Sequence, residues 1–338
     1  MARVGVAGTT SWGTTLAILG ARAGQEVNLW TRTEDEAERL RADGENHKFL
    51  PGIPLPDGIT VTSSADDAFG DVEIALIVVP SRMLRANARA IGGHIAPSAV
   101  VVSATKGLEL STRKRMSEIL AEELPEQFAD KICCMSGPNL AAEICQGKPS
   151  STVIASSSLA NVKHVQSLIS SSGFRIYTNG DIIGVELGGA LKNIIALGAG
   201  VCDVLNLGDN TKAAFMTRGL AEVARLGVAA GAEAITFAGL AGVGDLIATC
   251  SSPLSRNHQV GERLARGETL EQIRASMPHV AEGVDTTAAA AVLADAMGVD
   301  MPITKATYEV LFNGADVQDA ITALLGRVPA PEWAGVWP

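Results

Sequence analysis

The N-terminal half of the chain alternates short apolar runs with stretches whose apolar residues recur at helical spacing. The apolar runs predict strands and the stretches between them predict helices. Strands are expected at residues 3–7, 26–30, 73–79, 99–103, 131–135 and 151–155, and the first helices at residues 11–23 and 34–43. Because apolar strands separated by helices are typical of a sheet covered on both faces, we predict a doubly wound, mostly parallel α/β domain.

The pattern changes at about Gly180, where the strand-like runs end. Ala, Gly and Leu at helical spacing then predict helices at residues 186–205, 212–227, 259–266, 270–275, 286–297 and 303–311, followed by an irregular tail over residues 329–338. A length of 338 residues agrees with two domains, at roughly 150 residues each. We therefore predict an α/β domain over residues 1–180 and an all-α domain over residues 181–338.

Composition and charge narrow the class of protein. The net charge is −10 and no dense basic run occurs, so we expect no nucleic-acid partner. The five cysteines have no metal-ligand spacing, and an odd number does not fit a disulfide framework. We expect a cytoplasmic protein without a metal site. No apolar run reaches the roughly 18 residues of a membrane span, so none is predicted.

A glycine turn follows the first predicted strand. Gly8 and Gly13 take the first and third positions of a dinucleotide-binding turn, and Thr10 stands where the middle glycine is expected. A side chain there would crowd a pyrophosphate or form a hydrogen bond with it. The order of strand, turn and helix favours a Rossmann-type nucleotide site over a strand–helix turn without a ligand.

The second predicted strand runs into Thr31 and Arg32. An NAD-specific site usually carries an acidic residue at this point. A guanidinium can instead pair with a 2′-phosphate, so the sequence favours NADP(H). An ordinary surface arginine is the alternative.

Two further predicted strands end in small polar residues. Lys106 follows the strand at residues 99–103 and stands between Thr105 and Gly107, and the turn at residues 136–141 follows the strand at residues 131–135. Since ligands of open α/β sheets bind at the carboxyl ends of strands, we expect Lys106 to contact substrate or cofactor. The turn at residues 136–141 fits a ligand contact or a purely structural role.

The predicted helix that starts at Glu186 contains a single lysine, Lys192, among apolar residues and glycines. Such a lysine is expected to be buried, and burial without a counter-charge lowers the pKa of an ammonium. A lysine tuned in this way can give or take a proton. The alternative is a structural lysine whose charge is satisfied by a carboxylate such as Asp203 or Asp245.

Ser255, Arg256 and Asn257 precede the helix predicted at residues 259–266. Together they offer hydroxyl, guanidinium, amide and free N–H donors, which a phosphate or carboxylate site needs. A helix N-cap with a surface arginine is the alternative for any one of them.

These residues, in this order, resemble the bacterial NAD(P)-dependent glycerol-3-phosphate dehydrogenases. The resemblance spans nearly the whole chain and depends on the motifs at residues 11–14, 49–51, 79–81, 105–107, 136–138, 186–193 and 241–246, together with the segment at residues 255–257. It implies a Rossmann domain followed by a helical substrate-binding and catalytic domain. It also implies NAD(H)- or NADP(H)-dependent interconversion of dihydroxyacetone phosphate and sn-glycerol 3-phosphate, supplying phospholipid synthesis, by a homodimer.

The resemblance further implies roles for individual residues. Lys192 matches the proton donor and acceptor of the family. The implied substrate contacts are Lys106, Gly137, Asp245, Ser255, Arg256 and Asn257. The implied cofactor contacts are Ser11, Trp12, Arg32, Lys106, Ala141, Arg256, Val280 and Glu282. Two departures, Thr10 and Asn139, leave two alternatives open: a related two-domain reductase of another small 2-keto compound, and a non-catalytic NAD(P)-sensing paralogue.

Overall fold

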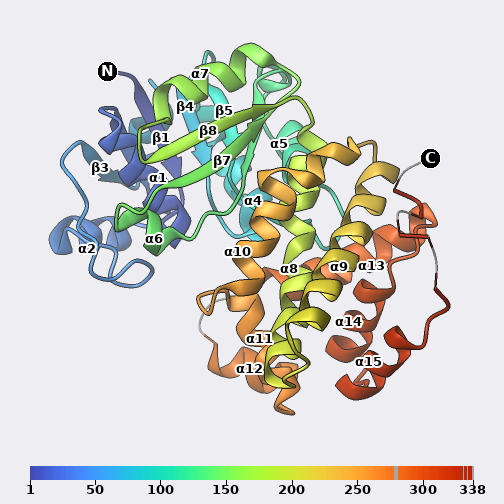
Figure 1. The fold of residues 1–338 in the computed structure, drawn as a ribbon. Coiled ribbons are helices and arrows are strands. Elements are labelled where there is room, and N and C mark those ends of the chain that lie inside the picture. Colours follow the sequence, from blue (N-terminus) through green and yellow to red (C-terminus); the bar gives the residue numbers. More distant parts are fainter. Residues whose placement is uncertain (278–280, 330, 333, 337–338) are drawn as a thin grey trace. The chain divides into compact units, whose positions relative to one another are not determined.

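The structure is a computed structural model that describes residues 1–277, 281–329, 331–332 and 334–336 (Figure 1). The chain forms two compact units, Met1–Thr105 with Met116–Ile182, and Lys106–Arg115 with Ile183–Pro338. The segment Lys106–Arg115 therefore belongs to the second unit, whereas the sequence prediction counted it within residues 1–180.

The first unit is built on an eight-stranded sheet with the order β3-β2-β1-β4-β5-β6-β7-β8. Its strands are β1 (Arg3–Ala7), β2 (Glu26–Trp30), β3 (Ile59–Thr62), β4 (Ile74–Ile77), β5 (Val100–Ser103), β6 (Ile132–Ser136), β7 (Ser150–Ala155) and β8 (Phe174–Asn179). Neighbouring strands are parallel except for the antiparallel pair β6 and β7. The prediction of a doubly wound, mostly parallel sheet is confirmed.

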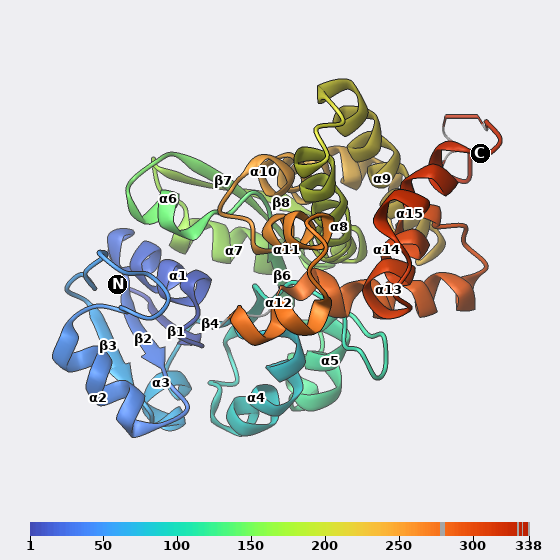
Figure 2. The same ribbon diagram turned by 90° about the horizontal axis from the view of Figure 1, so that it is seen from below.

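Helices cover both faces of this sheet. They are α1 (Ser11–Arg22), α2 (Glu34–Asp43), α3 (Ala65–Phe69), α4 (Leu84–Ile91), α5 (Met116–Glu123), α6 (Ala141–Cys145) and α7 (Leu159–Ile169), with short 3₁₀ helices at Ser81–Met83, Gly92–His94 and Glu126–Phe128. Alternate residues of the strands belong to two hydrophobic cores. Val4 and Leu76 pack with α1 and α7, whereas Ile77 and Val101 pack with α3, α4 and α5. Figure 2 shows α1 and α7 on one side of β1 and β4, and α3 and α4 on the other.

The second unit is helical over its described residues, as predicted. It contains α8 (Ile182–Val204), α9 (Asp209–Ala229), α10 (Asp245–Ser251), α11 (Arg256–Ala265), α12 (Leu270–Ser276), α13 (Glu282–Met297), α14 (Pro302–Phe312) and α15 (Val317–Leu325), a 3₁₀ helix at Ala234–Ala238 and a π turn at Leu240–Gly244. The sequence did not predict α10 or α15. α10 has only seven residues, and the apolar residues of α15 do recur at helical spacing, a signal that the prediction overlooked.

Helix α8 is the core helix of the second unit. Its length of 23 residues and its apolar composition would suffice to cross a membrane, but 78% of its most apolar window is buried inside the protein. This burial is the environment that the sequence predicted for Lys192, which lies in the first half of α8 and is itself buried.

Candidate active site

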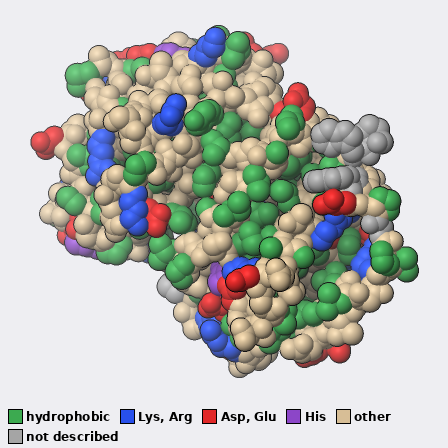
Figure 3. All heavy atoms as spheres, in the orientation of Figure 1, with side chains coloured by type: hydrophobic (Ala, Val, Ile, Leu, Met, Phe, Trp, Pro, Cys, Tyr) green, Lys and Arg blue, Asp and Glu red, His purple; other side chains and the backbone are tan. Residues whose placement is uncertain are grey.

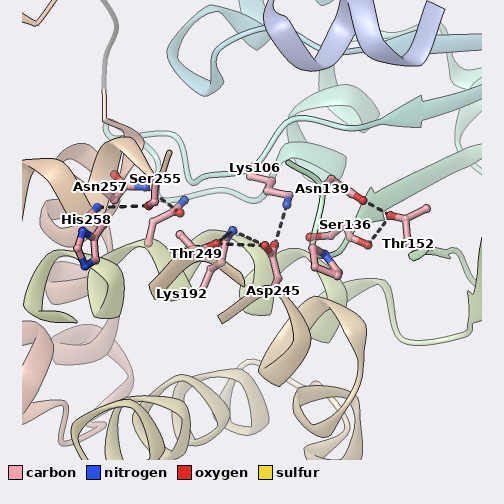
Figure 4. Close-up of polar contacts among 12 residues, drawn as sticks. Lys106, Ser136, Asn139, Thr152, Lys192, Asp245, Thr249, Ser255, Asn257 and His258 are labelled. Carbon is pink, nitrogen blue, oxygen red and sulfur yellow. Dashed lines mark hydrogen bonds and ion pairs between the residues drawn. The ribbon is translucent and has the colours of Figure 1, made fainter. Parts of the chain in front are cut away.

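Lys192 is held by two side chains of α10. Its Nζ donates to Asp245 Oδ1 and to Thr249 Oγ1, as the dashed lines in Figure 4 show. Burial lowers the pKa of Lys192 to about 8, a shift that the Asp245 carboxylate opposes and the Lys106 ammonium reinforces. The lysine is thus buried, as predicted, and has Asp245 as a carboxylate partner, while its lowered pKa leaves the proton-transfer role a prediction.

Asp245 binds a second ammonium through its other oxygen. Lys106 Nζ lies 2.7 Å from Asp245 Oδ2, and the carboxylate is only 2% exposed. Two positive charges thus share one negative charge in a buried setting. Such a cluster suits an oxygen on which negative charge develops during a reaction.

A glycine contact positions this cluster. The π turn Leu240–Gly244 leads directly into Asp245 at the start of α10. A Cβ atom at Gly188 of α8 would lie 2.8 Å from Ala241 O, so only glycine lets α8 pass this close to the turn. The backbone contact brings the α8 lysine and the α10 carboxylate within hydrogen-bonding reach.

The residues predicted to bind an anion open helix α11. Ser255 caps the helix, since its Oγ accepts from His258 N at 3.3 Å. Asn257 is buried: its Nδ2 donates to Asn193 Oδ1 at 2.9 Å, and its Oδ1 accepts from Gly283 N at 2.9 Å. Arg256 is exposed, and its guanidinium has no hydrogen bond or ion pair within the described residues. The arrangement fixes the backbone of this segment and leaves Arg256 free for a ligand.

The glycine turn of the first unit has the geometry of a nucleotide site. Gly8 has a φ of 111°, and a Cβ atom there would lie 2.6 Å from Val78 O. A Cβ atom at Gly13 would lie 2.0 Å from Gly8 O. Thr10 Oγ1 accepts from Gly13 N at 3.1 Å and donates to Val78 O at 3.0 Å. The hydroxyl of Thr10, which stands where a dinucleotide-binding turn usually has glycine, therefore caps the N-terminus of α1.

One polar atom beside this turn has no partner. The Nε1 atom of Trp12 is buried and makes no hydrogen bond within the part of the chain that the structure describes. Buried donors of this kind are normally satisfied, so a ligand acceptor is expected here. Together with the N-terminus of α1, this free indole N–H fits a dinucleotide cofactor. Arg32 is exposed two residues after the end of β2, and its contact with a 2′-phosphate stays a prediction.

The turn after β6 also carries unsatisfied polar atoms. Gly137 has a φ of 148°, and Asn139 Nδ2 donates to Thr152 Oγ1 at 3.0 Å, which in turn donates to Ser136 O at 2.8 Å (Figure 4). Ser136 Oγ and Asn139 Oδ1 are buried, and neither has a partner among the described residues. Asn139 therefore leaves a buried acceptor that has no partner among the described residues, just after the carboxyl end of β6.

The structure places the sequence-predicted residues as follows. In the second unit, Lys106, Lys192 and Asp245 come together, Ser255, Arg256 and Asn257 open α11, and Glu282 opens α13. In the first unit, Ser11 and Trp12 open α1, Arg32 follows β2, Gly137 follows β6 and Ala141 opens α6. Val280 lies outside the described residues. Over the described part of the chain, no group of three or more His, Cys, Asp or Glu side chains could hold a metal ion.

Sequence reasoning missed Thr249, which binds Lys192. It stands four residues after Asp245, and this spacing places both side chains on one face of α10. The spacing alone could have indicated the residue once Asp245 had been singled out.

The chain matches family models along most of its length. Residues 3–162 match the model described as NAD-dependent glycerol-3-phosphate dehydrogenase N-terminus, and residues 181–322 match the corresponding C-terminus. A glycerol-3-phosphate dehydrogenase (NAD(P)+) of Dehalococcoides mccartyi is 49% identical over 336 residues, which cover 99% of this chain and 94% of the relative. The Corynebacterium glutamicum enzyme of the same name is 49% identical, with 97% and 98% covered.

Solved structures agree with these matches. The crystal structure of glycerol-3-phosphate dehydrogenase from Coxiella burnetii superposes with a TM-score of 0.91 at 34% identity, covering 96% of this chain and 99% of that one. A ketopantoate reductase of Ralstonia eutropha superposes with a TM-score of 0.60 at 16% identity, which shows a shared fold and nothing more.

Proposed function

The chain belongs to the NAD-dependent glycerol-3-phosphate dehydrogenase family, and we propose that Lys192, Asp245, Lys106 and Arg256 carry out its reaction. The enzyme interconverts dihydroxyacetone phosphate and sn-glycerol 3-phosphate with NAD(P)H, supplying glycerol 3-phosphate for phospholipid synthesis. The observation that carries the assignment is the buried Lys192, whose ammonium is bound to Asp245 and Thr249 and whose pKa is lowered to about 8.

A bound nicotinamide cofactor would supply the hydride for the carbonyl carbon of the substrate. The residues of this chain would then stabilise and neutralise the negative charge that develops on the carbonyl oxygen. The Lys106 ammonium stabilises the negative charge as it develops on that oxygen, and the Lys192 ammonium donates a proton to the oxygen. Asp245 holds both ammonium groups in place. The freed Lys192 amine then takes up a proton from solvent.

We propose that Arg256 binds the substrate phosphate. A guanidinium forms paired, charge-assisted hydrogen bonds with phosphate oxygens, and this guanidinium is exposed while its neighbours in the sequence are buried. Gly137, Ser255 and Asn257 complete the proposed substrate contacts. Ser11, Trp12, Arg32, Lys106, Ala141, Arg256, Val280 and Glu282 remain the proposed cofactor contacts.

The direct test is turnover by the purified chain with dihydroxyacetone phosphate and NADPH or NADH, followed by the loss of absorbance of the reduced cofactor. We expect turnover with this substrate and much less with ketopantoate. Faster turnover with ketopantoate or another 2-keto compound would favour the related reductase. Cofactor binding without turnover of any of these substrates would favour the non-catalytic paralogue.

The pKa of Lys192 predicts a pH dependence. Reduction needs the ammonium, so we expect kcat/KM for dihydroxyacetone phosphate to fall above about pH 8, by about tenfold per pH unit. Oxidation of glycerol 3-phosphate needs the neutral amine, so its kcat/KM should rise with pH up to about pH 8 and level off above it. In Asp245→Asn, the carboxylate charge that favours the Lys192 ammonium is lost, so the pKa of Lys192 should fall. The pH at which each of the two kcat/KM profiles bends should then be lower than in the wild type. Profiles that bend at the same pH in Asp245→Asn as in the wild type would contradict the role of Lys192 in proton transfer.

We propose that the enzyme prefers NADP(H), because Arg32 stands where the cofactor 2′-phosphate is expected. Arg32→Ala should raise the KM for NADPH by about tenfold, the loss expected for a charge-assisted contact, and leave the KM for NADH unchanged. Arg39→Ala, which removes an exposed arginine of α2, is the matched control. Equal changes in the two KM values would show that Arg32 does not read the phosphate.

We also propose a cytoplasmic homodimer. The five cysteines are buried as free thiols, which fits a reducing compartment. Hydrophobic side chains gather over the part of the helical unit where Figure 1 labels α8 and α9 (Figure 3), and Leu325 and Val328 are largely exposed. Sedimentation equilibrium at several concentrations tests this, and a single species of 34.9 kDa throughout would contradict it.

A further inference from the structure

The two residues that follow Arg256 both point into the helical unit. Arg256 is exposed, whereas Asn257 and His258 are buried. An arginine side chain is long and flexible, so the region that its guanidinium can reach depends on how firmly the position of its Cα atom is fixed. The contacts of Asn257 and His258 therefore decide where the guanidinium can reach.

The imidazole of His258 contacts helix α8. Its Nε2 lies 2.7 Å from Oδ2 of Asp203, near the end of α8. Its Nδ1 lies 3.6 Å from Glu262 Oε1 on its own helix and has no hydrogen-bond partner within the described residues. Asp203 also forms an ion pair with Lys212 of α9, with Nζ 2.6 Å from Oδ2. Within the described residues, the imidazole thus faces the Asp203 and Glu262 carboxylates, and the Lys212 ammonium is paired with Asp203.

Helices α8 and α11 touch through their backbones. A Cβ atom at Gly200 would lie 2.1 Å from His258 O, and one at Gly261 would lie 1.8 Å from Leu197 O. These contacts set how close the helices come. Side-chain hydrogen bonds add to this packing at the first turn of α11.

Side-chain hydrogen bonds tie that first turn to two neighbouring helices. Asn257 binds Asn193 of α8 and Gly283 of α13, and His258 binds Asp203 of α8. The two acceptors stand ten positions apart on α8, or roughly 15 Å along the helix axis. Anchors this far apart oppose both rotation and tilting of the turn. Loss of the His258 bond leaves the turn tied to these helices through Asn257, at one position.

We propose that His258 is a positioning residue for substrate binding: through its contact with Asp203 it holds the first turn of α11 so that Arg256 meets the phosphate of the substrate. The inference rests on the proposed function, specifically on the role given to Arg256. His258 acts through Arg256, and the effect falls on binding of the phosphate group.

The surroundings of Asp203 allow this role to be separated from folding. Its side chain is 39% exposed and keeps Lys212 as a partner when the imidazole is removed. Replacement of His258 therefore leaves no buried carboxylate without a counter-charge. We expect the variant to fold while the first turn of α11 becomes less well held.

The test compares His258→Leu with His258→Gln. Leucine fills the site without a donor, whereas the Nε2 of glutamine can take the place of the imidazole Nε2 and donate to Asp203. We expect His258→Leu to raise the KM for dihydroxyacetone phosphate about fivefold, the effect of one hydrogen bond, with kcat unchanged. His258→Gln should restore the wild-type KM. Glu262→Gln, which keeps the Asp203 contact, is the matched control and should behave as wild type.

Dihydroxyacetone without its phosphate distinguishes positioning from a general structural effect. His258→Leu should leave kcat/KM for this truncated substrate unchanged, because the affected contact is absent. Equal losses for both substrates, or no rescue by glutamine, would overturn the proposal. If His258→Leu does not fold, Asp203→Ala removes the same bond from its exposed side and should show the same rise in KM. A wild-type chain that does not reduce dihydroxyacetone phosphate refutes the proposed function itself, and inhibitor constants for inorganic phosphate in the NADPH-bound chain then test the His258 contact.

Discussion

Alanine at Lys192 is expected to lower kcat for reduction of dihydroxyacetone phosphate about a thousandfold, within the range for loss of a general acid. The variant loses the proton donor, and Lys106 alone remains to face the developing oxyanion. Asp245 keeps Lys106 as a partner, 2.7 Å away, so no buried carboxylate is left without a counter-charge. The variant should therefore fold, and its affinity for NADPH should equal that of the wild type.

Two further variants separate proton transfer from charge. Lys192→Arg keeps a positive charge but cannot release a proton near neutral pH, so it should lose about as much kcat as alanine. Lys305→Ala, which removes an exposed lysine of α14, is the matched control. The measurements are steady-state kcat, the NADPH dissociation constant and the unfolding temperature. Near-normal turnover in Lys192→Ala would rule out the assigned role.

Alanine at Arg256 is expected to raise the KM for dihydroxyacetone phosphate about a hundredfold. Two charge-assisted hydrogen bonds to phosphate, at about 1.5 kcal/mol each, correspond to a loss of this size. The guanidinium is exposed and has no bond within the described residues, so the unfolding temperature should not change. The expected effect on kcat is smaller than the effect on KM, because the chemistry depends on Lys192.

Arg256→Lys tests the geometry of the contact. Lysine keeps the positive charge but lacks the planar guanidinium with its paired donors. We therefore expect Arg256→Lys to raise the KM about tenfold over the wild type. Dihydroxyacetone, which lacks the phosphate, should be reduced by wild type and Arg256→Ala with the same kcat/KM. An unchanged KM for dihydroxyacetone phosphate in Arg256→Ala would contradict a phosphate contact.

The strands that the sequence predicted are those buried on both faces. Six expected strands lie within two residues of β1, β2, β4, β5, β6 and β7. The two that were missed, β3 and β8, form the edges of the sheet. Their residues are partly exposed, so they lack the continuous apolar run that marks a central strand.

The burial of Lys192 could also be predicted, because a single charge within an apolar, helical stretch has no solvent-facing side to occupy. Its partner could not. The sequence left both Asp203 and Asp245 open as partners. In the structure, Lys192 pairs with Asp245, whereas Asp203 pairs with His258 and Lys212. The choice depends on which helices touch α8 at which turn. The periodicity of one helix contains no information about its neighbours.

Local order along the chain therefore determined the two-part architecture, the glycine turn and the candidate residues of the site. These features depend on contacts between residues close in sequence, whose spacing is visible in the sequence itself. Only the tertiary structure decided that Lys106 shares Asp245 with Lys192, that Thr249 joins them, and that Asn257 and His258 hold the turn beneath Arg256. Those contacts join residues 55 to 139 positions apart. Along α8, glycines at Gly188 and Gly200 let the neighbouring backbone come close enough for the side chains to meet.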